Sequence, residues 1–301
     1  MLGRVRLGLV RMTSVGALAI LACGTGDSTS SASSPPPDPT LETPATPAPE
    51  PTTAGPSNPP PTPTEPVPPS GLTCLAKHFV GKPKQRGATW VLELPDGTEL
   101  RWDDGATKTF DTKMEQPDLE DTLSIPYARG PIAAVSTINV DPGRIRNDFL
   151  FKATFGNTAN AVEAALVDVD FVGQSLRVHP RAAVALGKVS TKLKALVAQT
   201  PSLGAYLTGE LGGTFAWRPI ANTTRMSVHS YGAAIDIVVA KSNYWEWEKG
   251  PNGELSWKNQ IPQAIVDAFE AEGFAWGGRW YHYDTMHFEY RPELFDPTCA
   301  P

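Results

Sequence analysis

Hydrophobic residues recur along this chain with two spacings, and the longest regular stretch, 180–199, has the spacing of an α-helix. Its apolar positions are Ala182, Leu186, Val189, Leu193 and Leu196. Pro180 stands in the first turn and Pro201 follows the last, in agreement with the rules for helix termini. The same periodicity predicts shorter helices over 157–166 and 261–272.

Strand patterns occupy four other stretches. Alternating apolar and polar residues on both sides of a turn predict β-hairpins over 89–102 and 167–179. Apolar runs at 232–239 and 286–290 are further strand candidates. This order of helices and strands is that of an α+β fold, in which helices pack on a small antiparallel sheet.

The first 71 residues differ from the rest in composition. Residues 1–22 carry three arginines before a short apolar run, which predicts an export signal rather than a membrane span. The run ends in Ile-Leu-Ala-Cys, which resembles a bacterial lipobox, so we expect Cys23 to be lipidated; a plain secretory signal with a coincidental cysteine is the alternative. Residues 23–71 hold 16 of the 30 prolines and predict a disordered, extended spacer, with a ligand for proline-recognition modules as the alternative.

From Leu72 onward the composition is that of a folded protein, which we divide into a small β region over 72–130 and a main domain over 131–301. Cys74 and Cys299 lie near the two ends of this part. In an exported chain we expect them to form a disulfide, with two free thiols as the alternative. The net charge of −6 argues against a nucleic-acid partner, and we expect a monomer.

The candidate chemistry lies in two short segments, 217–237 and 281–290. Asp236 stands in an apolar strand pattern, where a carboxylate is unfavourable unless it is paired or binds a cation. His229 precedes that strand, and His287 begins the next one. Two imidazoles and a carboxylate, with a fourth position open to water, are the ligand set of a catalytic zinc site.

These segments also resemble a known family. Ser-x-His-x6-Asp at 227–236, Trp-Gly-Gly-x-Trp at 276–280 and Asp-x-x-His-Phe-Glu at 284–289 are similar to motifs of the zinc peptidases of bacterial cell walls. That family comprises the VanY-type D-alanyl-D-alanine carboxypeptidases and the L-alanyl-D-glutamate endopeptidases of phage lysins. The resemblance is strong over 200–290 and weaker over 144–199, and it implies a Hedgehog/D-Ala-D-Ala peptidase-like fold.

The resemblance implies a role for each matching residue. The zinc ligands are His229, Asp236 and His287. Asp284 is the catalytic carboxylate, at a position where many relatives have Glu. Arg218 and Ser227 match substrate-binding positions, and the two-pronged guanidinium of Arg218 suits a substrate carboxylate. The alternative for Arg218 is an exposed surface charge.

Several neighbouring side chains have two interpretations. Glu289 either orients a ligand histidine or is a plain surface carboxylate. His282 is either an electrophile near the site or part of an aromatic rim. The tryptophans at 245–280 suit stacking on substrate and core packing equally well. His78 and His179 we interpret as structural residues.

We therefore expect a Zn²⁺-dependent peptidase that hydrolyses an amide bond in the peptide stem of peptidoglycan, as a D,D-carboxypeptidase or an L-Ala-D-Glu endopeptidase, with Asp284 as the base. One alternative is a catalytically silent, zinc-containing, cell-wall-binding lipoprotein. Another is a zinc hydrolase of small D-amino-acid dipeptides. The lipidation of Cys23 predicts an extracytoplasmic, membrane-anchored protein, in the outer membrane or periplasm if the host is Gram-negative.

Overall fold

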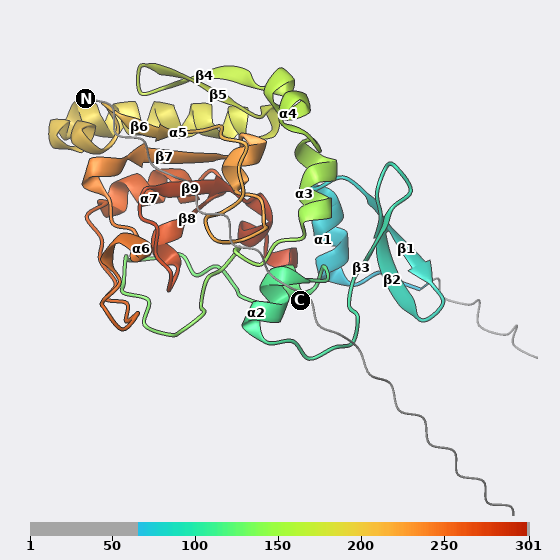
Figure 1. Ribbon diagram of the computed structural model, residues 1–301. Helices are drawn as coiled ribbons and strands as arrows, with labels where there is room; N and C mark the ends of the chain where they lie inside the picture. The colour runs from blue at the N-terminus through green and yellow to red at the C-terminus, as the bar shows by residue number, and fades with distance from the viewer. Residues whose placement is uncertain (1–65, 300–301) are drawn as a thin grey trace, which may run out of the picture. The chain divides into compact units, whose positions relative to one another are not determined.

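The computed structural model describes residues 66–299 (Figure 1). These residues include both segments, 217–237 and 281–290, that carry the candidate metal-binding and catalytic residues. The predicted signal, Cys23 and most of the proline-rich spacer lie outside the described residues. Among residues 66–299, no helix has both the length and the apolar character that crossing a membrane requires.

Helices and strands alternate irregularly along this part of the chain. The helices are α1 (Ser70–His78), α2 (Phe110–Glu115), α3 (Asp148–Phe155), α4 (Ala159–Ala165), α5 (Pro180–Gln199), α6 (Trp245–Glu248) and α7 (Gln263–Glu270). The strands are β1 (Lys82–Arg86), β2 (Thr89–Glu93), β3 (Glu99–Arg101), β4 (Val167–Phe171), β5 (Gln174–Val178), β6 (Leu211–Gly213), β7 (Ala234–Val238), β8 (Phe274–Trp276) and β9 (His287–Tyr290). Two short 3₁₀ turns also matter below, η3 (Val228–Tyr231) and η7 (Pro297–Cys299).

The predicted α+β class is confirmed, and so are the elements with the strongest patterns. Helix α5 begins and ends at the predicted residues, and both predicted hairpins form, as β2–β3 and β4–β5. Helix α7 is two residues shorter than predicted at each end, and its later start follows from the extended backbone of Pro262, which caps it. The sequence prediction did not include helices α1, α2, α3 and α6 or strands β1, β6 and β8.

The largest sheet is antiparallel, in the order β6-β7-β9-β8. On one face, Ile235, Ile237 and Phe288 are fully buried in a core shared with α5 and α7, which pack against each other (Figure 1). Burying each such side chain stabilises the fold by about 1.5–3 kcal/mol. Because side chains alternate along a strand, the residues between them point to the other face, which carries the candidate chemistry.

A second core joins the N-terminal part to the rest. Helix α1 packs on the three-stranded sheet β1-β2-β3, and its Leu72 and Leu75 are buried together with Phe151 of α3 and Tyr231 of η3. Tyr231 lies two residues after His229, so this core also supports the turn that carries the candidate ligand.

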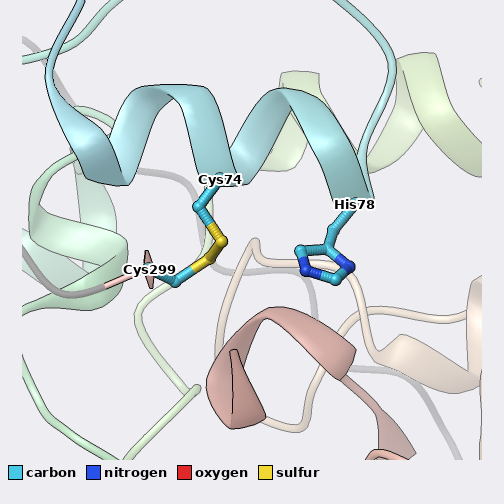
Figure 2. Close-up of side chains that lie close together, drawn as sticks. All are labelled: Cys74, His78 and Cys299. Atoms are coloured by element: carbon cyan, nitrogen blue, oxygen red, sulfur yellow. A yellow bond between two sulfur atoms is a disulfide. The ribbon is translucent and has the colours of Figure 1, made fainter. Parts of the chain in front are cut away.

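The predicted disulfide is present. Cys74 of α1 is bonded to Cys299 of η7, with their Cα atoms 5.0 Å apart (Figure 2). His78 lies one turn further along α1, close to the sulfur atoms. The bond joins residues 225 positions apart and ties the first helix to the end of the described chain.

Candidate metal centre and active site

A tight turn holds His229 in front of strand β7. The Ser227 hydroxyl caps η3 by accepting a hydrogen bond from the His229 amide at 3.4 Å. Gly232 ends the turn with a φ of +60°, a left-handed conformation that favours glycine. A Cβ atom at Gly232 would also lie 2.5 Å from the Leu166 side chain, so this position requires glycine on two grounds.

Asp236 and His287 come together through the register of the sheet. They are directly opposite each other on the antiparallel strands β7 and β9, so their side chains share one face. On the other side of β7, a Cβ atom at Gly212 would lie 2.5 Å from the Asp236 Cβ. Glycine at 212 therefore gives the carboxylate room beside strand β6.

The three candidate ligands converge on one point. His229 Nε2 lies 3.1 Å from Asp236 Oδ1 and 3.1 Å from His287 Nδ1, and the last two atoms are 2.9 Å apart. Ligand atoms about 2.0–2.1 Å from a tetrahedral zinc ion would be ~3.3 Å from one another. The triangle is thus close to the size that a zinc ion requires.

Hydrogen bonds on the far side of each ring set the direction of its lone pair. His229 Nδ1 is 3.3 Å from the Thr214 carbonyl, which can only accept, so this nitrogen carries the hydrogen. His287 Nε2 is 3.3 Å from a carboxylate oxygen of Glu289 and donates in the same way. Both remaining nitrogens then point lone pairs at a carboxylate, an arrangement that needs a cation or a proton between them.

The electrostatics of the cluster agree with that need. Burial alone would raise the pKa of Asp236, but the two imidazoles hold it well below its usual range. Burial alone would lower the pKa of His287, but hydrogen bonds to Asp236 and Glu289 raise it to about 10. Although burial opposes it, His287, Arg146 and Arg291 together lower the pKa of Glu289 to about 2. The site therefore favours positive charge at its centre.

Asp284 lies next to this cluster but is not one of the converging groups. Its backbone is fixed by a hydrogen bond to the Gly277 carbonyl at 3.0 Å, and a Cβ atom at Gly277 would lie 2.4 Å from the Asp284 carbonyl oxygen. Its Oδ1 is buried and has no hydrogen-bond partner within residues 66–299. Burial, and then the charge of Asp236, raise the pKa of Asp284 to about 7, so this carboxylate can exchange a proton near neutral pH.

Comparison with known families identifies this region. Residues 221–290 match a family described as D-alanyl-D-alanine carboxypeptidase. No curated protein matches the chain. The match is to a peptidase family and supports an activity on peptidoglycan peptides. It includes His229, Asp236, Asp284 and His287 but neither Arg218 nor anything before it.

Residues of the matching segment line a cavity of about 340 Å³. Ser227 and Arg218 both line it. The Arg218 side chain is exposed and has no hydrogen-bond partner among residues 66–299, whereas Ser227 is buried and already caps η3. The Arg218 guanidinium is therefore available to bind a ligand. The Ser227 hydroxyl stabilises the turn that carries His229.

The tryptophans divide between the two interpretations. Trp276 and Trp280 are buried and donate to backbone carbonyls, Trp276 to Thr285 at 2.9 Å and Trp280 to Pro142 at 2.8 Å. Trp245 and Trp247 line the cavity, and Trp247 is 62% exposed. Trp276 packs in the core, Trp280 combines packing with a place in the cavity wall, and Trp245 and Trp247 form part of the rim.

Three residues of the cavity region were missed by the sequence prediction. Asp141 is fully buried and accepts hydrogen bonds from the His282 amide at 2.9 Å and from the His282 ring at 2.6 Å. Arg144 and Arg146 line the cavity beside it. The only sequence signal was the alternation of two arginines around the apolar Ile145, which is buried.

Proposed function

We propose that this protein is a zinc peptidase that hydrolyses an amide bond in the peptide stem of peptidoglycan. One observation carries the proposal: His229, Asp236 and His287 converge on one point inside a segment that matches a carboxypeptidase family. The adjacent Asp284, whose Oδ1 is buried and has no partner within the described residues, favours catalysis over binding alone.

Zinc fits this donor set better than magnesium or calcium does. Two imidazole nitrogens and one carboxylate oxygen suit zinc, whereas the two hard cations take oxygen ligands. His229, Asp236 and His287 would hold the ion, with Thr214 and Glu289 orienting the two rings. A zinc ion there supplies Lewis-acid polarisation of a carbonyl and lowers the pKa of water.

Asp284 is the general base in this proposal. Its carboxylate takes a proton from the attacking water as the oxygen bonds to the carbonyl carbon. As the carbon–nitrogen bond breaks, the same proton passes to the leaving amine. In the metal-free site, burial and the charge of Asp236 raise the pKa of Asp284 to about 7, so this carboxylate already takes up a proton readily there.

Arg218 would grip a carboxylate of the stem peptide. It is exposed at the cavity wall, and its guanidinium can bind a carboxylate through two parallel hydrogen bonds. Ser227 would add a hydroxyl on the same wall. We further propose that lipidated Cys23 and the proline-rich spacer hold this monomeric domain outside the cytoplasm, on the membrane and within reach of the wall.

The test is to incubate the zinc-loaded, full-length protein with purified muropeptides and to read the masses of the products. Loss of one alanine from the end of a pentapeptide stem indicates a D,D-carboxypeptidase. Release of a stem peptide that lacks only its L-Ala indicates an endopeptidase. Binding to peptidoglycan without any product contradicts the proposal and favours the silent lipoprotein. Cleavage of free D-alanyl-D-alanine alone favours the dipeptide hydrolase.

A further inference from the structure

A second cavity adjoins the metal site. It has a volume of about 300 Å³ and shares Arg144, Trp245 and His282 with the first cavity. Its opposite wall is helix α2, which contributes Phe110 and Met114. This helix lies outside the segment that matches the carboxypeptidase family, so the match assigns the second cavity no role.

Arg144 and Arg225 line this cavity, and their ion pairs are long. Arg144 is 3.5 Å from Asp141, whose oxygens already accept two shorter hydrogen bonds from His282. Arg225 is 3.7 Å from Glu115, beyond hydrogen-bond range, and its buried Nε has no partner within residues 66–299. A buried guanidinium donor without an acceptor is costly, which favours an anion from outside.

The closeness of Arg225 to two other arginines also favours a bound anion. Burial, followed by repulsion from Arg146 and Arg144, lowers the pKa of Arg225 to about 10. A bound carboxylate would relieve this repulsion.

Helix α2 adds two carboxylates to the cavity wall. Asp111 and Glu115 are four residues apart on α2, so they lie on the same face of the helix, and both are exposed. Asp111 accepts no hydrogen bond from residues 66–299, and Glu115 has only the distant Arg225. Exposed carboxylates at this spacing suit an ammonium group of a ligand.

We propose that the second cavity binds an amino-acid head group, with an ammonium and a carboxylate on one carbon, at the end of a side chain of the substrate. Arg144 and Arg225 would take the carboxylate, and Asp111 and Glu115 the ammonium. The aromatic wall of Trp245 and His282 would cover the aliphatic part of that side chain. This inference rests on the proposed function, because it assumes that a stem peptide lies across the metal site.

Three synthetic stem peptides that differ only in their third residue test the proposal. Diaminopimelic acid offers the full head group, lysine offers the ammonium alone, and norleucine offers neither. We expect kcat/KM of the zinc-loaded protein to fall about tenfold at each step, mainly through KM, since a tenfold step corresponds to one charge-assisted contact.

Variants identify the groups responsible. Asp111→Asn combined with Glu115→Gln should bring the lysine-to-norleucine ratio of kcat/KM close to one. Arg225→Lys keeps a charge but loses the fork, and it should reduce the ratio of diaminopimelic acid to lysine. Glu210→Gln, an exposed carboxylate that lines neither cavity, should keep both ratios. A general folding defect lowers all rates together and leaves the ratios unchanged.

Equal kcat/KM for the three peptides, or ratios that none of the variants changes, would overturn the proposal. If no peptide is cleaved, the proposed function fails, and calorimetric binding of the same peptides decides on the cavity. Affinity that ranks diaminopimelic acid above lysine above norleucine supports the head-group site, and equal affinity refutes it.

Discussion

Two histidine clusters in this molecule bring potential metal ligands within 4.8 Å of one another, but they differ in what those ligands are free to do. At His229, Asp236 and His287 the three donor atoms point at a common centre. At Cys74, His78 and Cys299 the two sulfurs are bonded to each other (Figure 2). His78 Nε2 lies 2.9 Å from a carboxylate oxygen of Asp296. Proximity alone therefore does not make a metal site. The donor atoms must also have lone pairs that no covalent bond or hydrogen bond already uses.

The largest expected effect comes from removing a converging ligand. Asp236→Ala should abolish zinc retention after dialysis and reduce peptidase activity to background, because the two imidazoles alone leave the ion too few ligands. Atomic absorption on the dialysed protein measures the metal. Asp296→Ala, which removes the carboxylate beside the second cluster, is the matched control and should retain about one zinc per chain. Loss of zinc from the control instead would reverse our assignment of the two clusters.

Asp284→Asn tests the carboxylate that lies beside the first cluster. We expect turnover to fall about 10²–10⁴-fold, the usual contribution of a positioned general base. Zinc content should remain near the wild-type value, since Asp284 is not one of the converging groups. The same dialysed samples serve for metal counting and for muropeptide cleavage. A variant that loses its metal would make Asp284 a ligand, and one with full activity would transfer the base role to Glu289 or His282.

Removing the disulfide of the second cluster should lower the stability of the protein and leave its zinc content unchanged. The disulfide spans 225 residues, and chain-entropy estimates for such a loop give about 5 kcal/mol. Cys74→Ser combined with Cys299→Ser should lower the free energy of unfolding in urea by about 3–5 kcal/mol without changing zinc content. Intact-mass measurement after alkylation should show no free thiol at these positions in the unreduced wild type. Equal stability of the two proteins would show that the bond constrains little.

A third buried histidine sharpens the comparison, because it has no carboxylate partner. His179 caps helix α5, where its Nδ1 accepts from the Arg181 amide at 3.2 Å, and it lies edge-on to Phe155. Burial, and then the charge of Arg181, lower the pKa of His179 to about 4, the opposite of the shift at His287. Burial without an acid thus keeps an imidazole neutral, and burial between acids keeps it charged.

This depressed pKa predicts a loss of stability in acid. Above about pH 6.5 the His179 ring is neutral in both states and its contribution is complete. Between pH 6.5 and about 4 the unfolded chain takes up a proton that the folded chain refuses, so stability falls, by at most about 3 kcal/mol. His179→Asn keeps a capping side chain but does not titrate, so its unfolding free energy in EDTA should change less between pH 7.5 and 4.5. If the unfolding free energies of the two proteins changed equally with pH, groups other than His179 would be responsible for the loss of stability in acid.

Local patterns predicted much of this fold and the residues of the candidate metal centre. Helix α5 carries one apolar stripe along its 20 residues, and strand β7 alternates around Asp236, so both could be predicted from their own residues. Strand β1, with the sequence Lys-Pro-Lys-Gln-Arg, has no apolar pattern and is ordered by pairing with β2. Helix α2 is six residues long, too short for a periodic signal to emerge.

Pairings between distant residues could not be predicted in this way. Asp141 and His282 are 141 positions apart, and nothing in either neighbourhood marks them as partners. The chain around Asp141 also holds the loop at 280–282 through hydrogen bonds from the Trp280 ring and the Tyr281 amide. A single sequence without regular periodicity gives no information on such a contact, because only the folded backbone brings the two segments together.

The disulfide also determines where mechanical load enters the protein. Residues 74–299 form a covalently closed ring, and the chain enters and leaves that ring at neighbouring points. A pull on the N-terminal segment is therefore transmitted to Cys74, at the edge of the ring. Along the ring, β9 ends nine residues before Cys299, whereas β7 lies at least 61 residues from either cysteine. Tension on the N-terminal segment is therefore shared between α1 and η7 through the disulfide.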